Sequence, residues 1–156
     1  MASVAEHLVH QLEGAGVRHI YGIVGDSLNP VVDAVRRSKK IRWIHVRHEE
    51  TAAFAAAAEA EITGQLAVCA GSCGPGNLHL INGLYDANRS HLPVLAIASH
   101  IPTSQIGTGF FQETHPDRIF DECSVFSEMI SSSEQVPRVT RSAFQQAVSN
   151  HGVAVL

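Results

Sequence analysis

Cysteines are scarce in this 156-residue sequence, and long apolar runs are missing from it. The three cysteines, Cys69, Cys73 and Cys123, are odd in number and have no C-x-x-C spacing, so we expect small buried thiols in a reducing compartment. No apolar stretch approaches the length of a membrane span, and the N-terminus lacks the basic segment and apolar core of a signal peptide. These absences predict a cytoplasmic protein.

Positive charge is also sparse. The net charge is −4, the isoelectric point is near 6.2, and the only basic run, residues 36–40, is short. This pattern argues against a nucleic-acid partner, and we expect the run to be the solvated end of a helix. With 45% hydrophobic and 17% charged residues the chain suits one globular domain, and its slight apolar bias indicates a surface covered by a partner.

Helical and strand patterns alternate along the whole chain. Helices are predicted for residues 3–15, 48–62, 77–88 and 136–150, for a segment that includes Val31, Val32 and Val35, and for a short stretch near Arg118. Gly16 should end the first of them. Strands are predicted for 19–24, 41–46, 66–70, 93–98, 125–130 and 153–156. Such alternation predicts an α/β fold with a parallel sheet and helices on both faces, a Rossmann-like three-layer sandwich.

Ligands of a parallel α/β sheet bind beyond the carboxyl ends of its strands, so the turns that follow the strands are the candidate sites. The turns of interest comprise residues 25–27, residues 47–50, the glycine-rich loop 71–77 and the long polar segment 99–116. Because parallel strands end at the same edge, we expect these turns to lie side by side.

The turn Arg47-His48-Glu49-Glu50 leads into an alanine-rich helix, against which another backbone could approach closely. A carboxylate at that junction can be buried in an interface and carry proton chemistry, or it can cap the helix N-terminus. Glu49 and Glu50 are adjacent and diverge on a helix, so at most one can face a shared cleft. The residues by themselves favour capping.

Two familiar motifs are incomplete. The loop from Gly71 to Asn77 matches neither G-x-G-x-x-G nor the Walker pattern, which leaves a tight turn, a ligand contact or a phosphate cradle open. The zinc-protease helix motif would need a second histidine where this chain has Ala52. His45 and His48 could share a metal in principle. It is favoured instead that they lie on opposite faces of a strand, or that a histidine caps the following helix. We therefore assign no metal ligands.

Several segments together carry a resemblance to a known family. They read GIVGDS at 22–27, RHEETAAFAA at 47–56, CAGSCGPGNLHLINGLYDA at 69–87 and FQETHP at 111–116. In this order they resemble the N-terminal pyrimidine-binding domain of thiamine-diphosphate enzymes, most closely bacterial pyruvate dehydrogenase (quinone), or pyruvate oxidase. The similarity covers the whole chain, so the resemblance implies a thiamine-diphosphate-binding fold over residues 1–156.

The resemblance implies roles for particular residues. Glu49 would hydrogen-bond a ring nitrogen of the aminopyrimidine and promote the imino tautomer, which removes the thiazolium proton. The helix N-terminus favours the carboxylate whereas burial favours the acid, and such opposed influences suit a proton relay. The implied cofactor contacts are Val24, Gly25, Glu49, Gly74, Pro75 and Asn77. Phe111 and Gln112 would line the reaction cleft, with Gln112 hydrogen-bonded to pyruvate or its adduct.

The resemblance also implies partners. Thiamine diphosphate would lie between this domain and the pyrophosphate domain of another subunit, which suggests a homodimer through the pyrimidine domain and a homotetramer for the full enzyme. The family's Gly-Asp-Gly motif is missing here, where the chain reads Gly25-Asp26-Ser27. Mg²⁺ and FAD are therefore expected from other domains. Ubiquinone would accept the electrons, and the full enzyme could associate peripherally with the inner membrane.

The sequence thus predicts part of a pyruvate:quinone oxidoreductase that converts pyruvate to acetate and carbon dioxide. The chain stops inside its predicted last strand, so we expect a fragment of a longer polypeptide that is catalytically silent by itself. Alternatives are the pyrimidine domain of acetolactate synthase or of a 2-oxoacid decarboxylase, or a non-catalytic module that dimerises through the alanine-rich helix.

Overall fold

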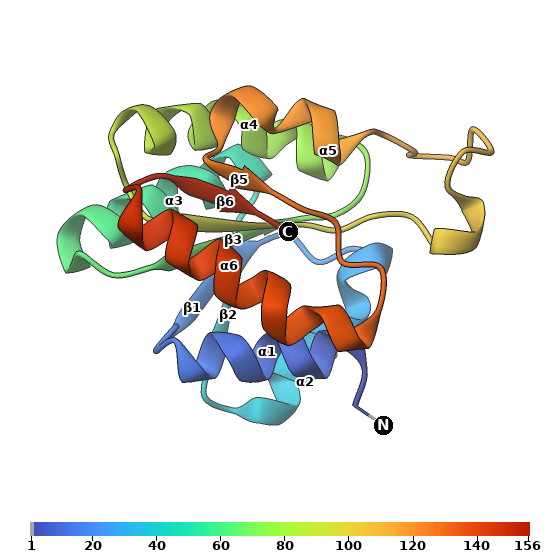
Figure 1. Cartoon of the computed structure of the whole chain (residues 1–156), viewed down its shortest axis with the longest axis horizontal. Coiled ribbons are helices and arrows are strands. Elements are labelled where there is room, and N and C mark those ends of the chain that lie inside the picture. The colour runs from blue at the N-terminus through green and yellow to red at the C-terminus, as the bar shows by residue number, and fades with distance from the viewer. Residues whose placement is uncertain (1) are drawn as a thin grey trace.

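A computed structural model describes residues 2–156 and contains a six-stranded sheet (Figure 1). Its strands are β1 (His19–Gly22), β2 (Arg42–His45), β3 (Ala67–Gly71), β4 (Val94–Ala98), β5 (Phe126–Ser127) and β6 (Val153–Val155). They lie in the order β2-β1-β3-β4-β6-β5, and every neighbouring pair is parallel. This confirms the predicted parallel sheet. The strand predicted over 125–130 is shorter than expected, because β5 is an edge strand with a single neighbour.

Helices cover both faces of the sheet, as the sequence predicts (Figure 1). They are α1 (Val4–Gly14), α2 (Asn29–Ser38), α3 (Glu49–Thr63), α4 (Pro75–Arg89), α5 (Pro116–Ile119) and α6 (Val136–Ser149). Short 3₁₀ turns lie in the connections between strands and helices, at η1 (Asp26–Leu28), η2 (Thr103–Gln105), η3 (Asp121–Cys123) and η4 (Ser133–Gln135).

Local capping explains where α1 begins and ends. The Ser3 hydroxyl accepts a hydrogen bond from the Glu6 amide at 3.2 Å, and the Glu6 carboxylate accepts one from the Ser3 amide at 2.8 Å. Ala15 is the C-cap residue, and Gly16 follows it with φ of +83°. The helix therefore ends at Gly14, one residue earlier than predicted, and Gly16 takes the left-handed conformation beyond the cap.

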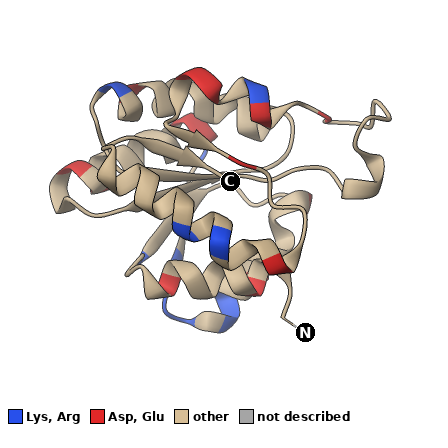
Figure 2. Cartoon of the chain, in the orientation of Figure 1, with Lys and Arg blue, Asp and Glu red and all other residues tan. Residues whose placement is uncertain are grey.

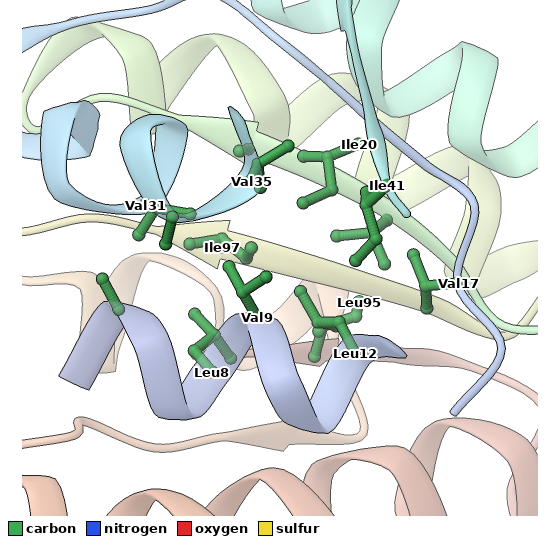
Figure 3. Packing of buried hydrophobic residues seen from close by; sticks show 14 of the residues in the cluster. Leu8, Val9, Leu12, Val17, Ile20, Val31, Val35, Ile41, Leu95 and Ile97 are labelled. Atoms are coloured by element: carbon green, nitrogen blue, oxygen red, sulfur yellow. The ribbon is translucent and has the colours of Figure 1, made fainter. Parts of the chain in front are cut away.

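The strand side chains alternate between two apolar layers. Val68, Leu95 and Ala154 face the layer made by α1, α2 and α6, and Figure 3 shows Leu8, Val9 and Leu12 of α1 packed there. The intervening strand residues, including Cys69, Ala96 and Val155, face α3 and α4. Burial on both faces explains why the central strands read as nearly continuous apolar runs.

Helices α3 and α4 pack unusually closely on the second layer. Buried alanines line α3, and α4 presents Gly83 to them. A Cβ at position 83 would lie only 2.5 Å from the Cβ of Ala53 and 3.0 Å from the Phe54 nitrogen. The small alanine side chains of α3 therefore allow α4 of the same chain to pack closely against it.

The cysteines and the charges follow the sequence expectation. Cys69, Cys73 and Cys123 are free and buried, and burial raises the pKa of Cys69 to about 12 and that of Cys123 to about 11. Figure 2 shows lysine and arginine scattered over the helices and turns rather than gathered on one element. Among the described residues, no helix is both long and apolar enough to cross a membrane.

The close contact of α3 with α4 predicts that Gly83→Ala destabilises the fold. An alanine in a helix interior normally gains about 0.5–1 kcal/mol over glycine. Here its methyl group would collide with Ala53, so we expect a net loss of about 1–3 kcal/mol in the free energy of unfolding, measured by urea denaturation. Gly14→Ala is the matched control, since a Cβ at Gly14 meets nothing within 4 Å. Equal stability of the two variants would contradict the packing argument.

Candidate functional site

The loops that follow β1, β3 and β4 are joined by hydrogen bonds between serine hydroxyls. The Ser27 hydroxyl lies 2.9 Å from that of Ser72 and 2.6 Å from that of Ser99, and it accepts a hydrogen bond from the Cys73 amide at 3.0 Å. The Ser99 hydroxyl donates to the Gly71 carbonyl at 3.0 Å. These contacts confirm that three of the four predicted turns, residues 25–27, 71–77 and the start of 99–116, share one edge of the sheet.

Glycines permit this close approach of the loops. A Cβ at Gly25 would lie 2.5 Å from the Ser72 hydroxyl oxygen, and one at Gly71 would lie 2.6 Å from the Gly76 carbonyl oxygen. The side chain of Asn77 is fully buried beneath the loop and donates from its Nδ2 to the Ser99 carbonyl at 2.8 Å. Its Oδ1 is buried with no hydrogen-bond partner among the described residues.

Glu49 points its carboxylate into this edge of the sheet. It is the first residue of α3, and its side chain is only 11% exposed. Its Oε2 lies 3.0 Å from Nδ1 of His79 on α4. A Cβ at Gly76 would come within 3.3 Å of its Oε1, so the two carboxylate oxygens face different neighbours.

The adjacent residues have different partners. His48 caps α3, because its Nδ1 accepts a hydrogen bond from the Glu50 amide at 3.3 Å. The side chain that caps α3 is therefore His48 and neither of the two glutamates. A cap was one of the two roles expected for His48 from the sequence. The Glu50 carboxylate accepts a hydrogen bond from the Asn82 amide group, and its side chain is 39% exposed. The two glutamates diverge as predicted, and Glu49 is the one that faces the glycine turn.

The segment with Phe111 and Gln112 lies over the same glycine turn. Gly74 has φ of +70°, and a Cβ there would be 2.7 Å from the Gln112 Cβ. The Cys73 thiol donates to the Gln112 Oε1 at 3.6 Å. Gln112 itself has φ of +65°, a left-handed conformation that side chains rarely adopt and that is found preferentially at functional sites.

The Glu113 carboxylate holds this segment together. It accepts hydrogen bonds from the amides of Gly107, of Gly109 at 2.8 Å and of Phe110 at 3.1 Å. These bonds, that from Gly107 foremost, lower the pKa of Glu113. The carboxylate thereby fixes the path of the chain into Phe111, a residue that is 78% exposed.

The remaining predicted site residues lie at the margin of the cluster. Val24 follows β1 and is 50% exposed, and Pro75 is the exposed first residue of α4. The structure thus gathers Glu49, Gly74 and Gln112 around one turn, and leaves Val24 and Phe111 at the surface beside it.

A hollow of about 560 Å³ lies beyond the ends of β4 and β6, and its lining includes Ser27, Ser99, His100, Ile106 and Met129. Neither Glu49 nor Gly74 lines it. The candidate site around Glu49 is therefore separate from this hollow.

Sequence reasoning missed several contacts. The serine cluster has a weak signal, because Ser27, Ser72 and Ser99 each lie just beyond a strand. The contact between His79 and Glu49 has none, because it joins residues 30 positions apart through the packing of two helices.

A comparison with known families matches residues 2–120 to the thiamine pyrophosphate enzyme, N-terminal TPP binding domain. The chain belongs to this family. Both the resemblance and the fold expected from the sequence are thereby confirmed.

Relatives of this TPP-binding domain include enzymes and an uncharacterised protein. The chain is 63% identical over 153 residues to an uncharacterised 42.6 kDa protein from the isoamylase 3′ region of Pseudomonas amyloderamosa. It is 41% identical over 150 residues to a pyruvate oxidase of Lactiplantibacillus plantarum and 38% identical over 152 residues to an acetolactate synthase of Mycobacterium bovis. These alignments cover 98%, 96% and 97% of this chain but only 39%, 25% and 25% of the respective relatives.

The glycine turn of this TPP-binding domain yields a stability prediction. We expect Gly74→Ala to lower the free energy of unfolding by about 2–4 kcal/mol, because it combines a strained backbone conformation with a collision against Gln112. Gly107→Ala is the control, since Gly107 also has positive φ but a Cβ there meets nothing within 4 Å. Urea denaturation should show a loss at least about 1 kcal/mol greater for Gly74→Ala. Equal losses would mean that the loop can move away from the turn without cost.

Proposed function

We propose that Glu49 is the residue of this domain that hydrogen-bonds the aminopyrimidine ring of thiamine diphosphate and promotes its activation. The observation that carries the proposal is the position of the Glu49 carboxylate. It is 11% exposed, lies at the N-terminus of α3, and has the glycine turn of residues 74–76 beside it.

The surroundings of Glu49 suit a flat, nitrogen-bearing ring. Gly74 and Gly76 carry no side chains, so a ring could approach the turn as closely as the backbone allows. The Glu49 carboxylate lies at the start of α3, largely withdrawn from solvent and beside the glycine turn, where it can hydrogen-bond a ring nitrogen. The cofactor, when bound, supplies the carbanion-stabilising chemistry.

We assign the other predicted contacts by their position around this turn. Gly25, Pro75 and the buried Asn77 shape the turn, and Val24, which follows β1, would contact the ring when the cofactor binds. The exposed Phe111 and the amide of Gln112 would face the substrate side of the cleft. The strained backbone of Gln112 and its contact with Cys73 support a defined role for that side chain.

For the whole reaction we propose oxidative decarboxylation of pyruvate, with FAD as second cofactor and a quinone, ubiquinone, as acceptor. The similarity to a pyruvate oxidase supports this choice. Mg²⁺, the diphosphate site and FAD would belong to further domains of a longer protein. Among the described residues, the group of closely spaced metal-ligating side chains includes two imidazoles, whereas Mg²⁺ prefers oxygen ligands.

We further propose that two copies of the domain meet through α3 and α4, within a homotetramer of the full enzyme in the cytoplasm or at the inner membrane. Phe54 on α3 and Leu78 on α4 are 41% and 46% exposed. Apolar side chains of this size on neighbouring helices support a covered surface.

Acetolactate synthesis is the second candidate, since the identity to an acetolactate synthase is nearly as high. Both reactions begin with pyruvate, and Glu49 would have the same role in each. Incubating the complete protein with pyruvate and a quinone, and identifying the product, separates them. Acetate with reduced quinone supports the oxidase, and acetolactate without quinone reduction supports the synthase.

Glu49→Gln tests the proposed role directly in the complete protein. We expect thiazolium proton exchange, followed by NMR, and pyruvate turnover to fall by about 10²–10⁴-fold, because an amide cannot exchange the proton. Glu50→Gln is the matched control and should change both rates little, since Glu50 faces Asn82 instead of the glycine turn. A normal rate of thiazolium proton exchange in folded Glu49→Gln protein would contradict the role assigned to Glu49.

A further inference from the structure

We propose that His48, Glu49 and His79 form a binding site for a transition-metal ion, best suited to Zn²⁺. The three side chains come from two helices, with His48 and Glu49 at the start of α3 and His79 in the first turns of α4. One ligand atom of each lies within 4.8 Å of the others.

The distances are close to those around a bound ion. Zinc lies about 2.0–2.2 Å from imidazole nitrogen and carboxylate oxygen, so donors around a tetrahedral ion are about 3.3 Å apart. Nδ1 of His79 is already 3.0 Å from Oε2 of Glu49. The rings of His48 and His79 are stacked, with their centroids 4.4 Å apart and an angle of 27° between their planes. Because a metal lies in the plane of each imidazole that binds it, both rings have to turn so that one nitrogen of each points at the ion.

The burial of the three side chains supports such a movement. The histidine side chains are 50% and 44% exposed, so their rings can turn, whereas that of Glu49 is 11% exposed and held in place by α3. An ion here would have three protein ligands and an open fourth position toward solvent. Catalytic zinc sites likewise have three protein ligands and a fourth position that water or substrate occupies.

The chemistry of the donors selects the class of ion. Two imidazoles and one carboxylate suit Zn²⁺ and neighbouring transition metals, while Mg²⁺ and Ca²⁺ prefer a shell of oxygen atoms. Helix α4 thus contributes a second histidine that α3 itself does not supply. The arrangement differs from the zinc-protease motif, in which the glutamate acts as a base and not as a ligand.

A consequence follows that rests on the proposed function of Glu49. An ion bound to Oε2 would occupy the carboxylate that is proposed to hydrogen-bond the aminopyrimidine ring. Zinc should therefore inhibit activation of thiamine diphosphate by competing at Glu49, whatever the substrate of the complete enzyme.

Direct metal binding tests the site. Chelator-treated protein is titrated with zinc chloride by calorimetry and with cobalt(II) by visible absorption, which reports tetrahedral coordination. We expect one site in the wild type and an affinity at least about tenfold weaker in His79→Ala and in His48→Ser, where serine preserves the N-cap. His10→Ala, on the exposed face of α1, is the matched control and should bind as the wild type does. Wild-type affinity in both cluster variants, or no binding by the wild type, would overturn the site.

The effect on the cofactor is measured separately, as thiazolium proton exchange with and without zinc. Zinc should slow exchange in the wild type, and the ratio of the two rates should return toward one in His48→Ser. If zinc binds but the rate of thiazolium proton exchange does not change, the metal site is supported and its competition with the cofactor is contradicted. Slow exchange in Glu49→Gln without zinc bears on the proposed function alone, so the two ideas can fail independently.

Discussion

Helices α3 and α4 lie so close together that only glycine fits at position 83. A Cβ at that position would come within 2.5 Å of the Ala53 Cβ. Both helices begin at the edge of the sheet where the strands end. Their separation therefore also decides how far the first turn of α3 is from the first turns of α4. The 3.0 Å contact between Glu49 and His79 is a consequence of that spacing.

The second constraint is the serine cluster beneath the glycine turn. Ser27, Ser72 and Ser99 come from loops after three different strands, and their hydroxyls lie within hydrogen-bond distance of one another through Ser27. Short hydroxyl side chains satisfy backbone groups here while leaving room for loops to meet at Gly25 and Gly71. The turn next to Glu49 is thus supported by side-chain bonds from neighbouring strands, which is how a site keeps its geometry.

The Glu49 carboxylate divides its oxygens between two surroundings. Its Oε1 faces the turn at Gly76, where a ring could approach, and its Oε2 faces His79. A cofactor ring and a metal ion would both need this one carboxylate. The proposed activation and its proposed inhibition by zinc would therefore depend on the same side chain.

The helices and the central strands could be predicted from the sequence because periodic apolar residues report burial locally. The order of motifs around Gly25, Glu49 and Gly74 likewise indicated the family. Periodicity could not show that β5 would pair along only two residues, because an edge position depends on the whole sheet. It also left Glu49 and Glu50 equivalent as helix caps. The resemblance singled out Glu49, but only the tertiary structure decided which partners the two carboxylates have. The packing of α3 on α4 directs Glu49 toward His79 and Glu50 toward Asn82, and no local pattern encodes a contact between residues 30 positions apart.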